Sequence, residues 1–350
     1  MIYFYVTRVE IAGQSAQASQ VVQMREAFLS QFGSAGKAIL VDRYETMFKK
    51  IRFWTSFLFA SLRVTFSCHR TEAFLLTRDL PVAVFAALFG FKVGCEVHHF
   101  GNGRQYRYLL RFASKCFKIH LLPISTPIKD RLLEFDLDPN LITVVPSAGP
   151  SDRKKKLFRL PRHEVFKYFG IIESDLTNKL LIVHTGTVLS ADSARRFIEF
   201  ARLAPEIVFV HVGRQNRDAQ RLFDIDTPPN LLLRQQAGRG LIWSLQEQAD
   251  FLFYDLAKTV STFWCASPLK VYEYLSSGRP IISTVTEGAV SEVLNGNVCF
   301  IIDSLTRPDV LQVLTASNQI KRQKVAAARG VSWDWDDRIR RVFSVLEHQS

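Results

Sequence analysis

The sequence has little of what marks fibrous, low-complexity or disulfide-rich chains. Its 350 residues include 17 glycines, 13 prolines and 5 cysteines. Such glycine and proline contents exclude a collagen-like or low-complexity chain. The cysteines form no Cys-x-x-Cys pair, so we predict reduced thiols in a cytosolic protein rather than a disulfide framework. A chain of this length can bury a core that needs no metal or disulfide to hold it.

Long apolar runs are also missing. The longest, Leu80–Phe91, is shorter than the ~20 residues that a membrane-spanning helix needs. The first residues, Met1–Val6, predict a strand and lack the charged start and long apolar core of a signal peptide. We therefore expect a cytoplasmic protein that does not cross a membrane. Peripheral contact with the inner face of the cell membrane stays open.

Several nucleotide- and metal-binding motifs are absent or incomplete. The nearest approach to Gly-x-Gly-x-x-Gly begins at Gly101 and has Tyr106 in the place of the third glycine, which argues against a dinucleotide site. No P-loop, zinc spacing or Gly-x-Ser-x-Gly elbow occurs. Three Asp-x-Asp pairs are present, and we interpret them as solvated or helix-capping carboxylates. We expect no metal and no cofactor. The pairs are Asp136/Asp138, Asp224/Asp226 and Asp334/Asp336.

Acidic residues are in deficit, which gives a net charge of +12. Nucleic acid, an anionic membrane surface and a phosphate-rich ligand all favour positive charge. Two basic windows, Lys37–Arg70 and Arg104–Arg131, lie in the first half of the chain. No RNA- or DNA-binding motif accompanies them, so we expect no nucleic-acid partner.

Short apolar runs alternate with amphipathic stretches along the chain, which predicts an α/β protein with parallel sheets. The segment 146–156, rich in proline, glycine, serine and charge, is the best candidate for a linker. A βα series precedes it and a second one follows. Expected strands are 2–7, 38–41, 63–67, 73–77, 92–97, 119–124, 142–145, 180–184, 207–212, 230–234, 251–254, 280–283 and 298–302. Expected helices include 16–31, 105–115, 190–203, 241–248, 267–276, 307–329 and 333–347.

The most informative stretch runs from Cys265 to Ser283. Ser267 is predicted to be a helix N-cap, and Pro268 to occupy the first helical position. The start of that helix offers free N–H groups and the positive end of the dipole, and Lys270 adds a full charge, which together suit a phosphate. Glu273, one turn further, can accept hydrogen bonds from a sugar diol. Gly278 ends the helix.

This run resembles the nucleotide-sugar signature of glycosyltransferase family 4, which has a Ser-Pro-Leu-Lys-x-x-Glu-Tyr run followed by Gly-x-Pro. The resemblance implies a GT-B fold: two Rossmann-like βα domains facing across a cleft. It implies an acceptor domain over 1–150, a nucleotide-sugar domain over 151–332 and a terminal helix over 333–350 that packs toward the first domain. It also implies that Glu273 binds the nucleotide ribose, and that the backbone near Pro268 and Leu269 holds the diphosphate.

Two further segments are similar to that family. Gly13 follows the first strand, where a family glycine lets the backbone approach the donor phosphates. Cys95-Glu96-Val97-His98 is similar to the family's Glu-x-His, whose histidine lies beside the transferred sugar. The resemblance therefore makes His98 and Glu273 candidate catalytic residues. Arg78, also at the end of a strand, fits an acceptor-side role and a structural ion pair equally well.

The sequence departs from the family pattern at the start of the second βα series. After Gly186 the family commonly has an arginine and, five residues later, a lysine, but Thr187 and Asp192 stand there. Cys265 replaces the first glutamate of the family pair. Neutralisation of the diphosphate is therefore expected from Lys270, from Arg214 or from the helix dipole.

The resemblance implies a retaining transferase, hexosyltransferase-like, that uses a UDP- or GDP-linked sugar as co-substrate and serves polysaccharide or glycolipid assembly. The segment 47–63, with basic residues around a Phe/Trp/Leu-rich helix, fits an interfacial helix and a core helix with a basic exposed side equally well. The first interpretation predicts a lipid-linked glycan acceptor. The rival function is a non-catalytic GT-B subunit that binds a partner or a glycan.

Overall fold

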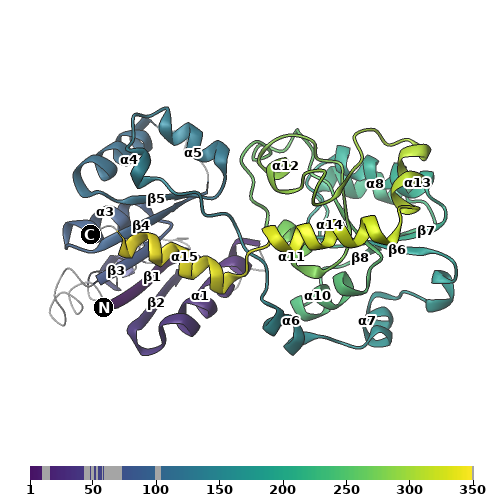
Figure 1. Ribbon diagram of the computed structural model, residues 1–350, viewed down its shortest axis with the longest axis horizontal. Coiled ribbons are helices and arrows are strands. Elements are labelled where there is room, and N and C mark those ends of the chain that lie inside the picture. Colours follow the sequence, from purple (N-terminus) through teal and green to yellow (C-terminus); the bar gives the residue numbers. More distant parts are fainter. Residues whose placement is uncertain are drawn as a thin grey trace. The chain divides into compact units, whose positions relative to one another are not determined.

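The computed structural model describes residues 1–9, 16–42, 48, 51–52, 54–56, 58, 73–98 and 104–348, and the chain divides into two compact units. The first unit comprises Met1–Ser147 and Trp335–Ser350, and the second comprises Ala148–Asp334. The sequence had placed these divisions at 150 and 332. Figure 1 follows the chain through both units.

The first unit is built on a parallel sheet which, in the part of the chain described, has the order β2-β1-β3-β4-β5. Because β1 pairs with both β2 and β3, the strand order reverses there, and such a switch point is where open α/β sheets bind ligands. The strands are β1 (Ile2–Val9), β2 (Gly36–Asp42), β3 (Ala73–Thr77), β4 (Lys92–Val97) and β5 (His120–Pro123). The helices are α1 (Ala16–Phe32), α3 (Leu80–Leu88), α4 (Arg104–Phe117), α5 (Thr126–Leu133) and α15 (Trp335–Glu347).

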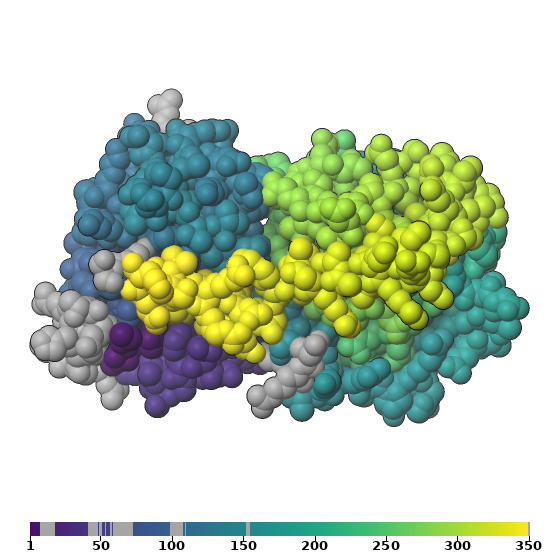
Figure 2. All heavy atoms as spheres, viewed as in Figure 1, coloured from purple at the N-terminus to yellow at the C-terminus, as the bar shows by residue number. Residues whose placement is uncertain are grey.

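The last helix, α15, belongs to the first unit although it ends the chain. The ring of Phe343 packs against those of Tyr3, Phe28 and Phe32, with centroids 4.8 to 5.7 Å apart. Leu346 lies so close to Gly94 in β4 that a Cβ on the glycine would meet it at 3.3 Å. In Figure 2 the yellow atoms of α15 lie across the purple atoms of the N-terminal elements. The helix therefore completes a core begun by the first strand.

The second unit contains a parallel sheet of order β11-β10-β9-β6-β7-β8 among the described residues. Its switch point lies between β6 and β9, and β7 is buried along its whole length, as a strand covered on both faces must be. The strands are β6 (Leu180–Thr185), β7 (Ile207–Val212), β8 (Leu231–Arg234), β9 (Phe251–Tyr254), β10 (Ile281–Ser283) and β11 (Phe300–Ile301). The helices are α6 (Asp152–Phe158), α7 (Arg162–Phe169), α8 (Ala191–Leu203), α9 (Arg217–Asp226), α10 (Arg239–Gln248), α11 (Leu269–Ser277), α12 (Ala289–Val293), α13 (Arg307–Leu314) and α14 (Asn318–Val331).

The expected α/β class with parallel sheets is confirmed, and two of the expected elements are wrong. The segment 146–156, predicted as a linker, contains the boundary between the units at Ser147 and Ala148, but helix α6 begins within it at Asp152, and Lys155 donates to the carbonyl of Ser276. The strand expected over 142–145 is only a single bridge from Ile142 to Leu121. The helix expected over 307–329 is two helices, because Ser317 caps a new one. The strand expected over 63–67 and more than half of the segment 47–63 lie outside the described residues.

Candidate functional site

The ends of β6 and β7 bring two glycines together at the edge of the second sheet. Gly186 has φ +105° and Gly213 has φ +152°, conformations that favour glycine. A Cβ on Gly213 would lie 2.1 Å from the carbonyl oxygen of Gly186, so no other side chain fits there. The N–H of Gly186 donates to the carbonyl of Val212 at 2.8 Å. The chain thus turns sharply beside the switch point and leaves Gly186 exposed.

Helix α11 begins one residue later than expected, and the predicted cap is wrong. Pro268 is the N-cap, with extended φ −69° and ψ 133°, and Leu269 is the first helical residue. The hydroxyl of Ser267 donates instead to the hydroxyl of Tyr272 at 3.2 Å. Proline fits this place because it needs no hydrogen-bond partner for its nitrogen. Pro268 makes no side-chain cap, and the N–H of Val271 donates to its carbonyl at 3.0 Å, so the N–H groups of Leu269 and Lys270 are the ones that can bind a ligand.

Lys270 lies in the first turn of α11, against the turn at Gly186. A Cβ on Gly186 would meet Cδ of Lys270 at 3.4 Å and Nζ at 3.6 Å. The ammonium lies 3.0 Å from Nε2 of His184 and 5.3 Å from the ring centroid of Tyr254. Burial lowers the pKa of Lys270 to about 8. The lysine therefore keeps its charge at neutral pH beside the loop that follows β6.

Glu273, one turn further along α11, faces the side chains of α10. The indole N–H of Trp243 donates to its carboxylate at 3.4 Å. Burial raises the pKa of Glu273, and hydrogen bonds from Trp243 and Gln246 oppose that shift. Gln246 also donates to the hydroxyl of Thr185 at 2.9 Å, and so links α10 to the end of β6. A partly buried carboxylate held in this way can accept hydrogen bonds from vicinal hydroxyls.

The positions that depart from the family pattern have contacts of their own. Thr187 and Arg214 are exposed at the ends of β6 and β7, and the N–H of Val188 donates to the carbonyl of Arg214 at 2.9 Å. Asp192 forms an ion pair with Arg195 at 2.8 Å. Cys265 is buried, and burial raises its pKa, so it is a small apolar side chain where the family has a glutamate.

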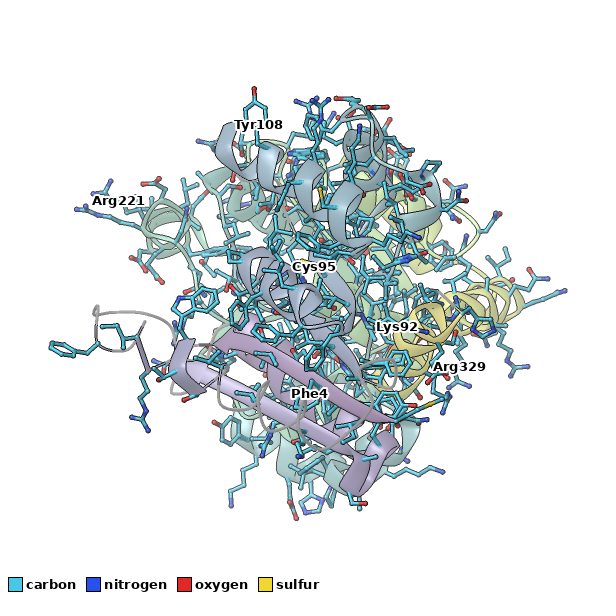
Figure 3. All side chains as sticks on the ribbon, turned by 90° about the vertical axis from the view of Figure 1, so that its left-hand side faces the viewer. Phe4, Lys92, Cys95, Tyr108, Arg221 and Arg329 are labelled. Atoms are coloured by element: carbon cyan, nitrogen blue, oxygen red, sulfur yellow. The ribbon has the colours of Figure 1, made fainter. Side chains whose placement is uncertain are left out.

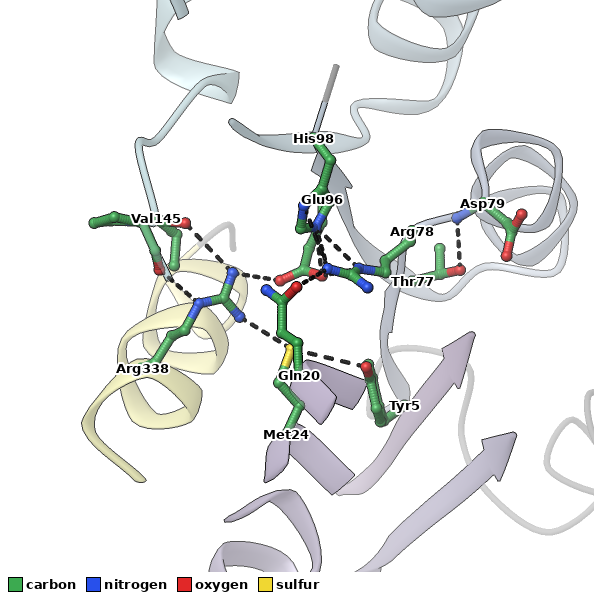
Figure 4. A network of polar contacts seen from close by, with 11 residues as sticks. Tyr5, Gln20, Met24, Thr77, Arg78, Asp79, Glu96, His98, Val145 and Arg338 are labelled. Carbon is green, nitrogen blue, oxygen red and sulfur yellow. Dashed lines mark hydrogen bonds and ion pairs between the residues drawn. The ribbon is translucent and has the colours of Figure 1, made fainter. Parts of the chain in front are cut away.

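A separate polar cluster lies in the first unit, around Glu96 near the end of β4 (Figure 4). Its carboxylate is fully buried between two arginines: Arg78 at 3.0 Å and Arg338 of α15 at 2.5 Å. These charges hold the pKa of Glu96 well below its usual range, although burial opposes them. Arg338 also donates to the carbonyls of Pro146 and Val145. The cluster therefore joins β4, the segment that leaves the first unit and the helix that returns to it.

His98 lies beside that cluster and is neutral at pH 7. Arg78 donates to Nε2 of His98 at 2.9 and 2.7 Å and to the side-chain oxygen of Gln20 at 2.6 Å. Burial and the charge of Arg78 lower the pKa of His98 to about 4. Nε2 of His98 also lies 3.4 Å from a carboxylate oxygen of Glu96, so the histidine belongs to the same polar network. Of the two roles open to Arg78, the structural ion pair with Glu96 is present.

The structure places the predicted residues in two groups. Gly186, Lys270 and Glu273 lie together in the second unit, with Thr187 and Arg214 at the neighbouring strand ends and Ser267, Pro268 and Leu269 at the start of α11. His98 lies in the first unit with the Glu96 cluster. Gly13 lies outside the described residues. In the described part of the chain no group of three His, Cys, Asp or Glu side chains could hold a metal ion.

Several residues that hold these groups in place were not predicted. In the second unit they are His184, His211, Trp243 and Tyr274, and in the first unit it is Arg338, which binds Glu96. One signal was present. His184-Thr185-Gly186 and His211-Val212-Gly213 have the same spacing at the ends of two strands, and the register makes the histidines direct neighbours. Tyr274 accepts a hydrogen bond from the N–H of Thr185 at 2.7 Å, a contact over 89 residues that no local pattern predicts.

Comparison with solved structures identifies the fold. HepE of Anabaena, in complex with UDP-glucose, has a TM-score of 0.65 at 10% identity, and 99% of this chain covers 100% of that one. A glycosyltransferase of Rickettsia africae has a TM-score of 0.70 at 12% identity, over 99% and 98% of the two chains. WaaG, a glycosyltransferase involved in lipopolysaccharide biosynthesis, has a TM-score of 0.60 at 11% identity, over 99% of both chains. The chain has the GT-B fold of these proteins. No family model and no curated protein matches its sequence.

Proposed function

We propose that the chain is a retaining glycosyltransferase of family 4 that moves a sugar from a nucleotide diphospho-sugar to a glycan or lipid-linked acceptor. The observation that carries the proposal is the position of Lys270. Its charged ammonium and the uncapped start of α11 meet the exposed Gly186 turn at the switch point of a parallel sheet. A diphosphate is the ligand that this combination suits best.

The second unit is proposed as the nucleotide-sugar domain. The backbone at Pro268 and Leu269, together with Ser267 and Lys270, faces the diphosphate. Gly186, Thr187 and Arg214 line the loops after β6 and β7. Glu273 binds the ribose diol. UDP or GDP is the expected nucleotide, and the bound UDP-glucose in HepE supports UDP. We expect no metal requirement, because fixed positive groups can stabilise the departing diphosphate.

The proposed reaction retains the anomeric configuration. Its transition state resembles an oxocarbenium ion, so stabilisation of the departing diphosphate by Lys270 and the α11 dipole lowers the barrier. An oxygen of the donor phosphate takes the proton of the acceptor hydroxyl. His98, which is neutral, orients the sugar by a hydrogen bond to one of its hydroxyls. Gly13 is proposed to approach the donor phosphates.

The first unit is proposed as the acceptor domain. Helix α4 carries basic residues and no acidic ones, and its outer face exposes Tyr108, Arg111, Phe112 and Lys115. Figure 3 shows Tyr108 projecting from this helix. Aromatic and basic side chains on one helix face suit an anionic membrane surface, where a lipid-linked acceptor would be presented on the cytoplasmic side. No described helix is long and apolar enough to cross a membrane.

The proposal is tested first by nucleotide binding. Thermal unfolding is measured with UDP, GDP, ADP and dTDP and with their sugars, for the wild type and Glu273→Ala. One nucleotide should raise the melting temperature of the wild type and lose that effect in the variant. Glu292→Ala, at an exposed glutamate in α12, is the control and should respond as the wild type does. An equal shift in Glu273→Ala would disprove the ribose assignment, and no shift in the wild type would disprove the function.

A second candidate function is a non-catalytic GT-B subunit that binds a partner or a glycan in an assembly complex. Thr187, Asp192 and Cys265 favour it, because each stands where the family has a charged residue for the donor. Turnover separates the two candidates. Release of nucleotide diphosphate from any donor sugar favours the transferase, whereas binding without turnover over all donors favours the subunit.

A further inference from the structure

Two buried histidines lie behind Lys270. His184 and His211 are neighbours in the register of β6 and β7, and their Nδ1 atoms are 2.9 Å apart. Phe197 packs on the ring of His184 at 4.6 Å and Phe223 on that of His211 at 6.2 Å. Both imidazoles are at most 1% exposed. Neither histidine has a part in the proposed reaction. Their hydrogen bonds indicate what they do instead.

The contacts determine where the ring protons are. The ammonium of Lys270 can only donate, so Nε2 of His184 must be the acceptor. A neutral His184 then has its proton on Nδ1, which donates to Nδ1 of His211. His211 in turn has its proton on Nε2, and that atom is buried with no hydrogen-bond partner among the described residues. The reverse arrangement would place the Nε2–H of His184 against the ammonium. A donor chain therefore runs from Lys270 through His184 to His211.

Both imidazoles must be neutral for this chain to exist. Burial and the charge of Lys270 lower the pKa of His211 to about 3 and hold the pKa of His184 well below its ordinary value. Asp255 and Glu273 act on Lys270 through space and favour its charged form, but Asp255 binds Arg196 at 2.6 Å and Glu273 accepts from Trp243. The direct hydrogen-bond partner of the Lys270 ammonium is therefore a neutral imidazole.

We propose that His184 and His211 are positioning residues that hold the Lys270 ammonium at the end of β6, with a neutral group as its direct anchor, to bind the diphosphate of the nucleotide sugar. This inference rests on the proposed function. A carboxylate anchor would fix the lysine equally well but would pair with its charge. A neutral imidazole fixes the ammonium without an ion pair, so the lysine can pair with the ligand instead, which compensates for Thr187 and Asp192 at the positions where the family has Arg and Lys. The cost is one buried N–H without a partner, on His211.

The test compares the binding of a nucleoside diphosphate with the binding of the nucleoside alone. Affinities for UDP and for uridine are measured on the full chain by calorimetry, and the same pair is used for GDP, ADP or dTDP if one of those stabilises the wild type instead. His184→Leu removes the anchor and should weaken UDP binding about ten-fold while uridine binding stays within two-fold. His184→Gln can accept from Lys270 and donate to His211, and should restore most of the affinity for UDP.

A control variant and a measurement of the ring protons complete the test. Phe197→Leu disturbs the packing around His184 without touching the hydrogen bonds, and should lower the melting temperature but keep the UDP-to-uridine ratio. Histidine-selective ¹⁵N NMR of the wild type should show His184 protonated on Nδ1 and His211 on Nε2. Equal losses of UDP and uridine binding in His184→Leu, or the opposite tautomers, would overturn the inference alone. A wild type that binds no nucleotide would overturn both the inference and the function.

Discussion

Arg338, in the last helix, and Glu96, in the fourth strand, form an ion pair of 2.5 Å in which both side chains are fully buried. The pair joins residues 242 positions apart within the first unit. The same guanidinium donates to the carbonyl of Pro146, just before the chain leaves that unit. The first turn of α15 is therefore fixed to β4, the strand that precedes His98, by charge as well as by apolar packing.

Arg338→Met should strongly destabilise the protein. The substitution leaves Arg78 as the one arginine beside the buried Glu96 among the described residues and removes the donor to Pro146, and breaking a buried ion pair costs about 3–5 kcal/mol. Urea unfolding followed by circular dichroism measures the loss. The control is Arg340→Met on the same helix, which removes an exposed pair with Asp337 and should cost about 0–1 kcal/mol. Equal losses in the two variants would show that the buried pair has no special importance.

Acid should destabilise the wild type partly through His98. Its pKa is about 4 in the folded protein against 6.5 for an ordinary histidine, so the unfolded chain binds the proton first as the pH falls. The contribution of His98 to stability is complete above pH 6.5 and is lost as the pH falls through 4. His98→Gln should therefore reduce the slope of unfolding free energy against pH between 6.5 and 4. An unchanged slope would contradict the neutral His98 described above.

Gly213→Ala should destabilise the second unit, because the new Cβ would collide with the carbonyl of Gly186 and the backbone has a positive φ. We expect a loss of about 1–3 kcal/mol or more. Gly238→Ala is the matched control: its φ is −60° and nothing lies within 4 Å of the added Cβ. That variant should change stability by less than about 1 kcal/mol. Thermal unfolding of the two variants tests the prediction, which fails if their melting temperatures agree.

Trp243→Phe should weaken nucleotide binding by removing the N–H that holds Glu273. The phenyl ring keeps the aromatic contact with Phe158, so the loss is mainly one hydrogen bond, about 0.5–1.5 kcal/mol. Because Glu273 is assigned to the ribose, nucleoside and nucleoside diphosphate should be affected equally, unlike the result expected for His184→Leu. Trp264→Phe, at an exposed tryptophan, should bind as the wild type does. A loss confined to the diphosphate would contradict the ribose assignment.

Much of the fold could be predicted from the sequence, because periodicity and turn residues act over short distances. The strands at 73–77, 92–97 and 207–212 were predicted with their observed bounds. Errors fall where tertiary contacts override a local pattern. The segment 146–156 has the composition of a linker and contains the boundary between the units, yet Lys155 binds the end of α11 and the residues from Asp152 onward form a helix. Ser267 has the preferred residue type for an N-cap, yet its hydroxyl binds Tyr272 instead.

Propensity, periodicity and neighbouring residues suffice for the alternation of strands and helices and for the local run from Ser267 to Gly278, so both follow from the order of residues along the chain. The positive charge and its concentration in the first half of the chain follow from that order too. What surrounds the run depends on the tertiary fold. The register of β6 and β7 brings His184 against His211, and the fold of the first unit brings Arg338 to Glu96. These contacts join residues far apart in the chain, and their charges and protons depend on burial, which no local pattern contains.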